Sequence, residues 1–137
     1  MAAATGGCMC GAVHYECTAT PIFMGNCHCR DCQRASGGAY APAIGVLRSA
    51  VKITGDVKYY ESKADSGSMA RRGFCANCGS RLFSLPPFAP DLMVILATSL
   101  DDPSIFKPGM DIYTSSAQPW DHMDPALAKF PQMPPTG

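Results

Sequence analysis

The amino-acid sequence predicts a mostly β fold made of several small antiparallel sheets. Apolar residues alternate with polar ones in short runs, which is the pattern of half-buried strands. Glycine and proline, with 13 and 12 copies among 137 residues, separate these runs. The length is that of one domain, so we expect residues 1–137 to form a single unit.

The expected strands follow one another along most of the chain. They are residues 12–17, 39–47, 51–54, 57–62, 69–75, 80–85, 92–100 and 111–116. The turn residues at 54–56 predict a hairpin between the third and fourth of these strands. Residues 30–36 predict one short helix that ends at Gly37 and Gly38. After Trp120 we expect an irregular tail.

The composition narrows the class of protein. The formal net charge is zero, so a general nucleic-acid binder, which normally carries a basic excess, is not expected. The longest apolar run, 92–97, is far too short to span a membrane. The first residues lack the basic and apolar regions of a signal peptide, so we expect a cytoplasmic protein. Thiols stay reduced there, which favours metal ligands over disulfides.

Seven of the eight cysteines lie in three short clusters. Cys8 and Cys10 form a CxCG motif, and Cys75 and Cys78 form a CxxCG motif. A glycine after the last ligand permits a tight turn around an ion. Together the two motifs supply four thiolates, which is the donor set of a closed, structural zinc site.

The middle cluster, Cys27, Cys29 and Cys32, supplies three thiolates from one loop. Three protein ligands leave a fourth position for water or substrate, which distinguishes a catalytic zinc site from a structural one. Thiolate sulfur selects zinc, copper(I) or iron–sulfur over magnesium or calcium. We therefore expect two Zn²⁺ ions per chain, one closed and one open.

Other interpretations of these residues remain. His28 could complete a second structural site, although it lies between two ligands and would tend to point away from their metal. Cys29 and Cys32 could form a CxxC redox pair. Cys17 alternates with Val13 and Tyr15, which predicts a buried core thiol. His14 falls on the other face of that strand and is expected at the surface.

The motifs, taken together, resemble the GFA family of glutathione-dependent formaldehyde-activating enzymes, which includes the centromere protein V group. The resemblance covers most of residues 6–121, which we take as the core of the domain. The matching stretches are CMCGAVHYEC (8–17), NCHCRDCQRASGG (26–38), TGDVKYYES (54–62), RRGFCANCGSRLF (71–83), ATSLDDP (97–103) and DIYTSSAQPW (111–120).

The resemblance implies a β-tent fold of small antiparallel sheets with two zinc ions. The family's structural zinc falls on the CxCG and CxxCG motifs, and its catalytic zinc falls on the middle cluster. The implied activity is that of a carbon–sulfur lyase that joins glutathione to formaldehyde, or acts on a related small carbonyl, imine or thiol adduct. Many members carry histidine where this chain has Asp111, which predicts a different substrate if that histidine binds substrate.

Several residues near the middle cluster are candidates for substrate binding. Arginines suit the carboxylates of a glutathione-like ligand, and polar side chains or an aromatic ring could line or cover the pocket. These candidates are Arg30, Arg34, Gln33, Ser36 and Trp120. The alternative functions are a zinc-stabilised binding module without turnover and a methionine sulfoxide reductase, which would need a zinc-free nucleophilic cysteine. The sequence gives no indication of oligomeric state.

Overall fold

The structure is a computed structural model that describes residues 3–64 and 66–134. Its strands are β1 (Ala4–Gly7), β2 (His14–Cys17), β3 (Phe23–Cys27), β4 (Ala41–Leu47), β5 (Val51–Thr54), β6 (Val57–Lys63), β7 (Met69–Cys75), β8 (Arg81–Leu85), β9 (Leu92–Leu96), β10 (Met110–Ile112) and β11 (Ala128–Lys129). The α-helix is α1 (Arg30–Ser36), and short 3₁₀ turns lie at Arg48–Ala50, Ala97–Ser99, Pro103–Ile105 and Thr114–Ser116. The expectation of a mostly β fold is confirmed.

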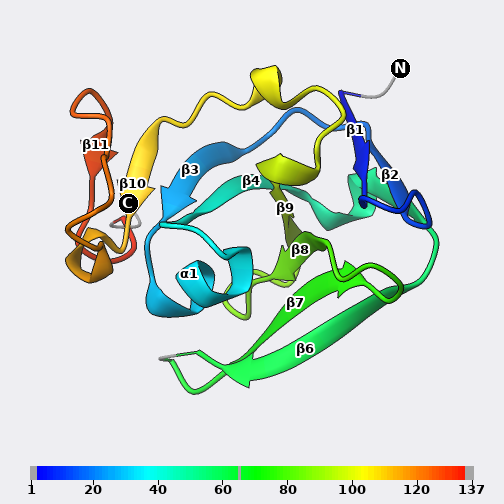
Figure 1. Cartoon of the computed structure of the whole chain (residues 1–137), viewed down its shortest axis with the longest axis horizontal. Coiled ribbons are helices and arrows are strands. Elements are labelled where there is room, and N and C mark those ends of the chain that lie inside the picture. The colour runs from blue at the N-terminus through cyan, green and yellow to red at the C-terminus, as the bar shows by residue number, and fades with distance from the viewer. Residues whose placement is uncertain (1–2, 65, 135–137) are drawn as a thin grey trace.

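The described strands form two sheets. The smaller sheet has the order β1-β2-β5, and the larger has the order β11-β10-β3-β4-β9-β8-β7-β6. Most neighbours are antiparallel, but β10 runs parallel to both β3 and β11. Figure 1 shows α1 between the β3–β4 part of the large sheet and the β6–β7 hairpin. The sheet therefore frames α1 and the loop that precedes it.

Strand β2 shows why the periodicity in the sequence predicted strands. Val13, Tyr15 and Cys17 are buried, whereas His14 and Glu16 point to solvent. The ring of Tyr15 packs edge-on against Phe83 of β8, with 5.2 Å between ring centroids, so the core joins the two sheets. The expected core position of Cys17 and surface position of His14 are both confirmed.

The short helix α1 has the bounds that the sequence predicted. Cys29 is its N-cap, and its sulfur accepts a hydrogen bond from the backbone N–H of Cys32. Gly37 ends the helix in the left-handed conformation, with φ of 74°, which glycine adopts without steric cost. The capping group of the helix is thus one of the three clustered cysteines.

Some elements differ from the sequence-based expectation. Residues 54–56 do not close a hairpin, because β5 pairs with β2 in the small sheet while β6 pairs with β7 in the large one. The expected strand at 111–116 shortens to β10, since Tyr113 takes a left-handed conformation, with φ of 55°. Strands β1, β3 and β11 were not expected. Among the residues that the structure describes, no helix is long and apolar enough to cross a bilayer.

Candidate metal centres and the residues around them

The first candidate metal centre brings together the first two and the last two cysteines of the sequence. Cys8 and Cys10 follow β1, while Cys75 ends β7 and Cys78 lies in the turn before β8. Their four sulfur atoms lie within 4.8 Å of one another, with 3.6 Å between Cys8 and Cys10 and 3.8 Å between Cys10 and Cys75. A disulfide would require about 2.05 Å. Tetrahedral zinc with bonds of about 2.3 Å places sulfurs about 3.8 Å apart, so the cluster fits that ion.

Hydrogen bonds hold these sulfurs in place. The backbone N–H of Val13 donates to Sγ of Cys8 at 3.2 Å, and the N–H of Cys78 donates to Sγ of Cys75 at 3.4 Å. The hydroxyl of Ser80 lies 3.1 Å from Sγ of Cys78 and, with nearby backbone hydrogen bonds, lowers the pKa of that thiol to about 5. Ionised sulfur is the form that binds metal, so this cluster is prepared for a cation.

The second candidate metal centre lies between the end of β3 and the start of α1. The sulfurs of Cys27, Cys29 and Cys32 lie within 4.8 Å of one another. Contacts with the thiols of Cys27 and Cys32, aided by the N–H of Cys32, lower the pKa of Cys29 to about 2. The same crowding raises the pKa of Cys27, because ionised sulfurs repel one another in a partly buried site. A bound cation would remove this repulsion, so the three thiols also fit a metal.

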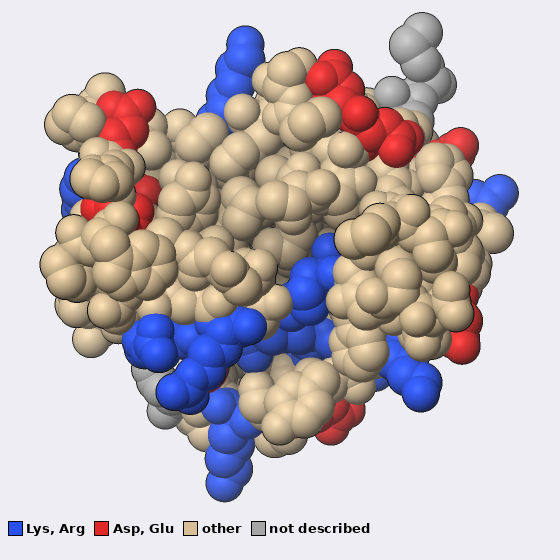
Figure 2. Space-filling view, viewed as in Figure 1, with Lys and Arg blue, Asp and Glu red and all other residues tan. Residues whose placement is uncertain are grey.

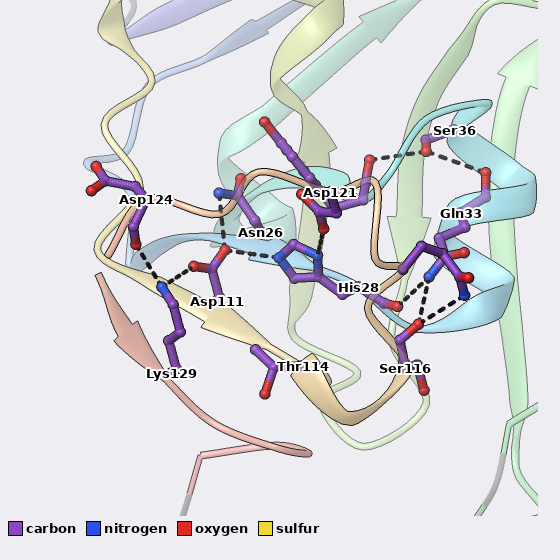
Figure 3. Close-up of polar contacts among 12 residues, drawn as sticks. Asn26, His28, Gln33, Ser36, Asp111, Thr114, Ser116, Asp121, Asp124 and Lys129 are labelled. Atoms are coloured by element: carbon purple, nitrogen blue, oxygen red, sulfur yellow. Dashed lines mark hydrogen bonds and ion pairs between the residues drawn. The ribbon is translucent and has the colours of Figure 1, made fainter. Parts of the chain in front are cut away.

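His28 is not the fourth ligand of this centre. Its side chain is fully buried, and Figure 3 shows its ring between the carboxylates of Asp111 and Asp121. Nε2 lies 2.8 Å from Oδ1 of Asp111, and Nδ1 lies 2.6 Å from Oδ2 of Asp121. Both ring nitrogens therefore face carboxylates and neither is directed at the cysteines. The interpretation of the middle cluster as a Cys₃His structural site is wrong for this geometry.

Asp111 is the centre of a buried polar cluster beneath the cysteine loop. It accepts hydrogen bonds from His28, from Nδ2 of Asn26 at 3.3 Å and from Nζ of Lys129 at 2.9 Å. Burial alone would raise the pKa of Asp111, but these three donors outweigh it and hold the pKa below its usual range. With 1% of its side chain exposed, Asp111 lies behind the loop and supports it through His28.

The segment after Trp120 contributes to this cluster. Strand β11 pairs with β10 and brings Lys129 to Asp111, while Asp121 comes from the preceding loop. The sequence indicated an irregular tail here because the segment has little periodicity. Its two contacts with the cluster are made by the single charged side chains of Asp121 and Lys129, and no periodic pattern predicts such contacts.

The structure separates the five candidate substrate-binding residues. Arg30 and Arg34 are exposed on α1, and Trp120 is 61% exposed. Gln33 is buried; its amide nitrogen donates to the backbone carbonyls of His28 (2.7 Å) and Ser116 (3.0 Å), while its oxygen accepts from Arg30. Gln33 therefore fastens the cysteine loop to the chain near residue 116.

Ser36 lies at the edge of a pocket of about 470 Å³ beside α1. The other walls come from the start of β4, the end of β9 and the turns that follow it. The lining residues are Ser36, Gly38, Ala39, Tyr40, Pro42, Arg81, Leu96, Ala97, Thr98, Pro103 and Phe106. Arg81 also interacts electrostatically with Cys32, so this arginine both lines the pocket and lies near the three-cysteine cluster.

A bent β fold with one four-cysteine cluster and one three-cysteine cluster defines a small protein with two candidate metal centres. Its family follows from comparison: the sequence model of the family described as glutathione-dependent formaldehyde-activating enzyme (GFA) matches residues 3–116. The chain therefore belongs to the GFA family, as its motifs predicted. Membership supports a formaldehyde-activating or related metal-binding role.

A solved structure shares the fold. The crystal structure of a Rhodobacter sphaeroides protein, a structural genomics target, matches with a TM-score of 0.57 and 22% sequence identity. The match covers 71% of this chain and 87% of that chain. At this identity the likeness concerns the fold alone. The search of curated proteins gave no significant match.

Proposed function

We propose that this protein is a zinc-dependent carbon–sulfur lyase that adds glutathione, or a similar small thiol, to formaldehyde or a related small carbonyl. The observation that carries the proposal is the three-cysteine cluster, because the histidine within its loop, His28, is held by carboxylates on both ring nitrogens. The donor set therefore leaves one coordination position for a substrate. Family membership supplies the class of reaction.

The reaction itself is a simple addition. The thiol sulfur forms a bond to the carbonyl carbon, the carbonyl π bond breaks, and the thiol proton ends on the oxygen to give a hydroxymethyl thioether. A zinc ion held by Cys27, Cys29 and Cys32 would supply a lowered thiol pKa and a polarised carbonyl. A thiolate-rich site is a weak Lewis acid, which favours thiol exchange over strong activation of water.

The chain's own residues position this site. Cys29 caps α1 while serving in the cluster, so the direction of its sulfur is fixed by the helix. Gln33 and His28 hold the loop from behind through buried hydrogen bonds and ion pairs. Such support keeps ligands within a narrow geometry. Arg30, Arg34 and Trp120 are exposed near or beyond the loop, and their part in substrate binding stays a prediction. We place the reaction in the cytoplasm, where thiols stay reduced.

The proposal is tested by the rate at which zinc-loaded protein forms S-hydroxymethylglutathione, followed by exchange NMR against the spontaneous reaction. We expect acceleration by the unaltered protein and its loss in Cys29→Ser. Cys17→Ser is the matched control, because Cys17 is buried in the core and belongs to neither cluster. Full activity in a Cys29→Ser protein that has lost its second metal would overturn the proposal. No acceleration by the unaltered protein would favour the binding module.

A further inference from the structure

Two arginines that the sequence did not single out as ligand contacts lie together on neighbouring strands. Arg72 is in β7 and Arg81 begins β8. The register between the strands shifts after Gly73, so that Phe74 pairs with Arg81. Paired residues share a face of the sheet, and Arg72 shares the face of Phe74. The irregularity therefore turns Arg81 to the same face as Arg72, which is a known use of β-bulges near functional sites.

Both arginines lie within electrostatic reach of the three-cysteine cluster. After its neighbouring thiols, Arg72 is among the groups that lower the pKa of Cys29. Burial, followed by the charge of Arg72, lowers the pKa of Arg81, and the Cys32 thiol acts in the opposite direction. Figure 2 shows basic side chains on the floor of a hollow in the middle of the face that carries α1. The two guanidinium groups thus repel each other beside the cysteines.

Neither guanidinium has a carboxylate partner among the described residues. Arg72 donates to the hydroxyl of Ser62 at 3.1 Å, and Arg81 donates to the carbonyl of Phe83 at 3.3 Å. Nε of Arg81 is buried and has no hydrogen-bond partner in the described part of the chain. A buried guanidinium donor without a partner is costly unless a ligand satisfies it. Within the same described residues, Nε of neighbouring Arg71 also lacks a hydrogen-bond partner, but it has a carboxylate nearby, with Oε1 of Glu61 at 3.3 Å.

The charge balance indicates the kind of ligand. Three thiolates around a divalent zinc carry one negative charge in excess, whereas Arg72 and Arg81 carry two positive charges. The two arginines therefore neutralise the negative charge of the zinc-bound cluster, and one positive charge remains unbalanced. Arg81 is also the one charged residue that lines the pocket beside α1, whose other walls are mostly apolar or small.

We propose that Arg72 and Arg81 form an anion subsite that binds a carboxylate of the substrate, with the substrate's sulfur directed at Cys27, Cys29 and Cys32. This inference rests on the proposed function and names its substrate class as carboxylate-bearing thiols or their carbonyl adducts. Guanidinium groups suit this role because their planar donors match a carboxylate. The surplus positive charge and the unpartnered donor of Arg81 are then both satisfied by the same ligand group.

The experiment measures thiol binding to protein whose second centre holds cobalt(II), through the change in its visible spectrum. The probes are two acid–ester pairs of different length: 3-mercaptopropionate with its methyl ester, and glutathione with its diethyl ester. We expect at least one acid to bind about tenfold or more tightly than its ester, because a hydrogen bond to a charged group strengthens binding by about that factor. Comparable binding of acid and ester in both pairs would overturn the inference.

Variants of the two arginines test whether these residues cause the preference for the acid over the ester. Arg81→Gln and Arg72→Gln should each reduce the acid-to-ester preference to about threefold or less. Arg71→Gln is the matched control, because it removes the same charge one residue away but on the opposite face, and it should keep the preference. An unchanged preference in Arg81→Gln would also overturn the inference. If the variants fail to fold, the acid–ester comparison on the unaltered protein still decides.

Failure of the proposed function has a different signature. If neither acid nor ester changes the cobalt spectrum, the second centre has no exchangeable position, and the lyase proposal fails together with this inference. If all four thiols change the spectrum without regard to charge, the open centre stands and only the anion subsite is refuted.

Discussion

Nε2 of His28 lies 2.8 Å from Oδ1 of Asp111, and both side chains are shielded from solvent at 0% and 1% exposure. The residues are 83 positions apart, and their contact joins the cysteine loop to strand β10. The cluster contains two carboxylates, Asp111 and Asp121, and two basic groups, His28 and Lys129. The relationship shows how a histidine between two clustered cysteines supports their loop while both its ring nitrogens face carboxylates.

Replacing His28 should test this arrangement. His28→Ala would leave two buried carboxylates facing a cavity, so we expect a loss of about 3–5 kcal/mol in the free energy of unfolding. Urea denaturation of the zinc-loaded protein measures it. His14→Ala is the control, because His14 is exposed on β2 and should change stability by less than about 0.5 kcal/mol. Loss of the second metal at unchanged stability would mean instead that His28 is a ligand.

The two cysteine clusters should release metal separately. We expect about two zinc ions per chain by elemental analysis, falling to one in a mild chelator while the far-ultraviolet circular dichroism persists. The four-cysteine centre should be the one retained, since it has a closed donor set and joins β1–β2 to β7–β8. Cys29→Ser should give one zinc in a folded protein, whereas Cys75→Ser should unfold it. Equal loss of both ions would contradict the division into closed and open centres.

Tyr15 should make the protein less stable in alkali. Burial, partly offset by the hydrogen bond to Ser99, raises its pKa to about 12 from a usual value of 10.0. A raised pKa for an acid means that the neutral form is favoured in the fold. Its contribution is complete below pH 10 and is lost as the pH rises towards 12, by up to about 1.4 kcal/mol per pH unit. Urea unfolding at stepped pH measures the slope, which Tyr15→Phe should reduce; an unchanged slope would refute the assignment.

Gly6 should resist replacement by alanine. A methyl group there would lie less than 3.0 Å from the backbone carbonyl of Ser99 and from the ring of Tyr15. Relieving these contacts would require the backbone at Ser99 or at Gly6 to shift. We expect Gly6→Ala to cost about 1–3 kcal/mol in thermal or urea unfolding. Gly38→Ala is the comparison, because its nearest neighbours would be 3.9 Å away. Equal stability of the two variants would show that the sheet edge at Gly6 relaxes freely.

The sequence predicted most of the regular structure and the grouping of the cysteines. Alternation in β2 and the glycine after α1 act locally, so they can be recognised without knowing the fold. The spacing of the cysteines predicted the two clusters, because ligand geometry restricts which residues can share an ion. These predictions succeeded because each depends on neighbouring residues in the sequence or on the geometry of one site.

The remaining features depend on contacts between distant segments. The destination of β5 could not be predicted, because its turn is compatible with a hairpin and only tertiary packing directs it to β2. Arg72 and Arg81 share a face because the register between β7 and β8 shifts after Gly73. This shift cannot be recognised from the residue pattern of either strand. In the sequence, Asp111 had no role beyond a departure from the histidine of many family members, and only its burial against His28 shows that it supports the loop.

The spacing of the cysteines also bears on how the chain matures during its synthesis. Cys27, Cys29 and Cys32 emerge from the ribosome together and can capture a metal as soon as their loop is free. Cys8 and Cys10 must wait for Cys75 and Cys78, because half of their centre has not yet been made. The stretch between them has to be ordered before that centre closes, at an entropic cost that grows with its length. The three-cysteine cluster can therefore bind an ion before the four-cysteine cluster is complete, and strands β8 to β11 are still to be made after Cys78.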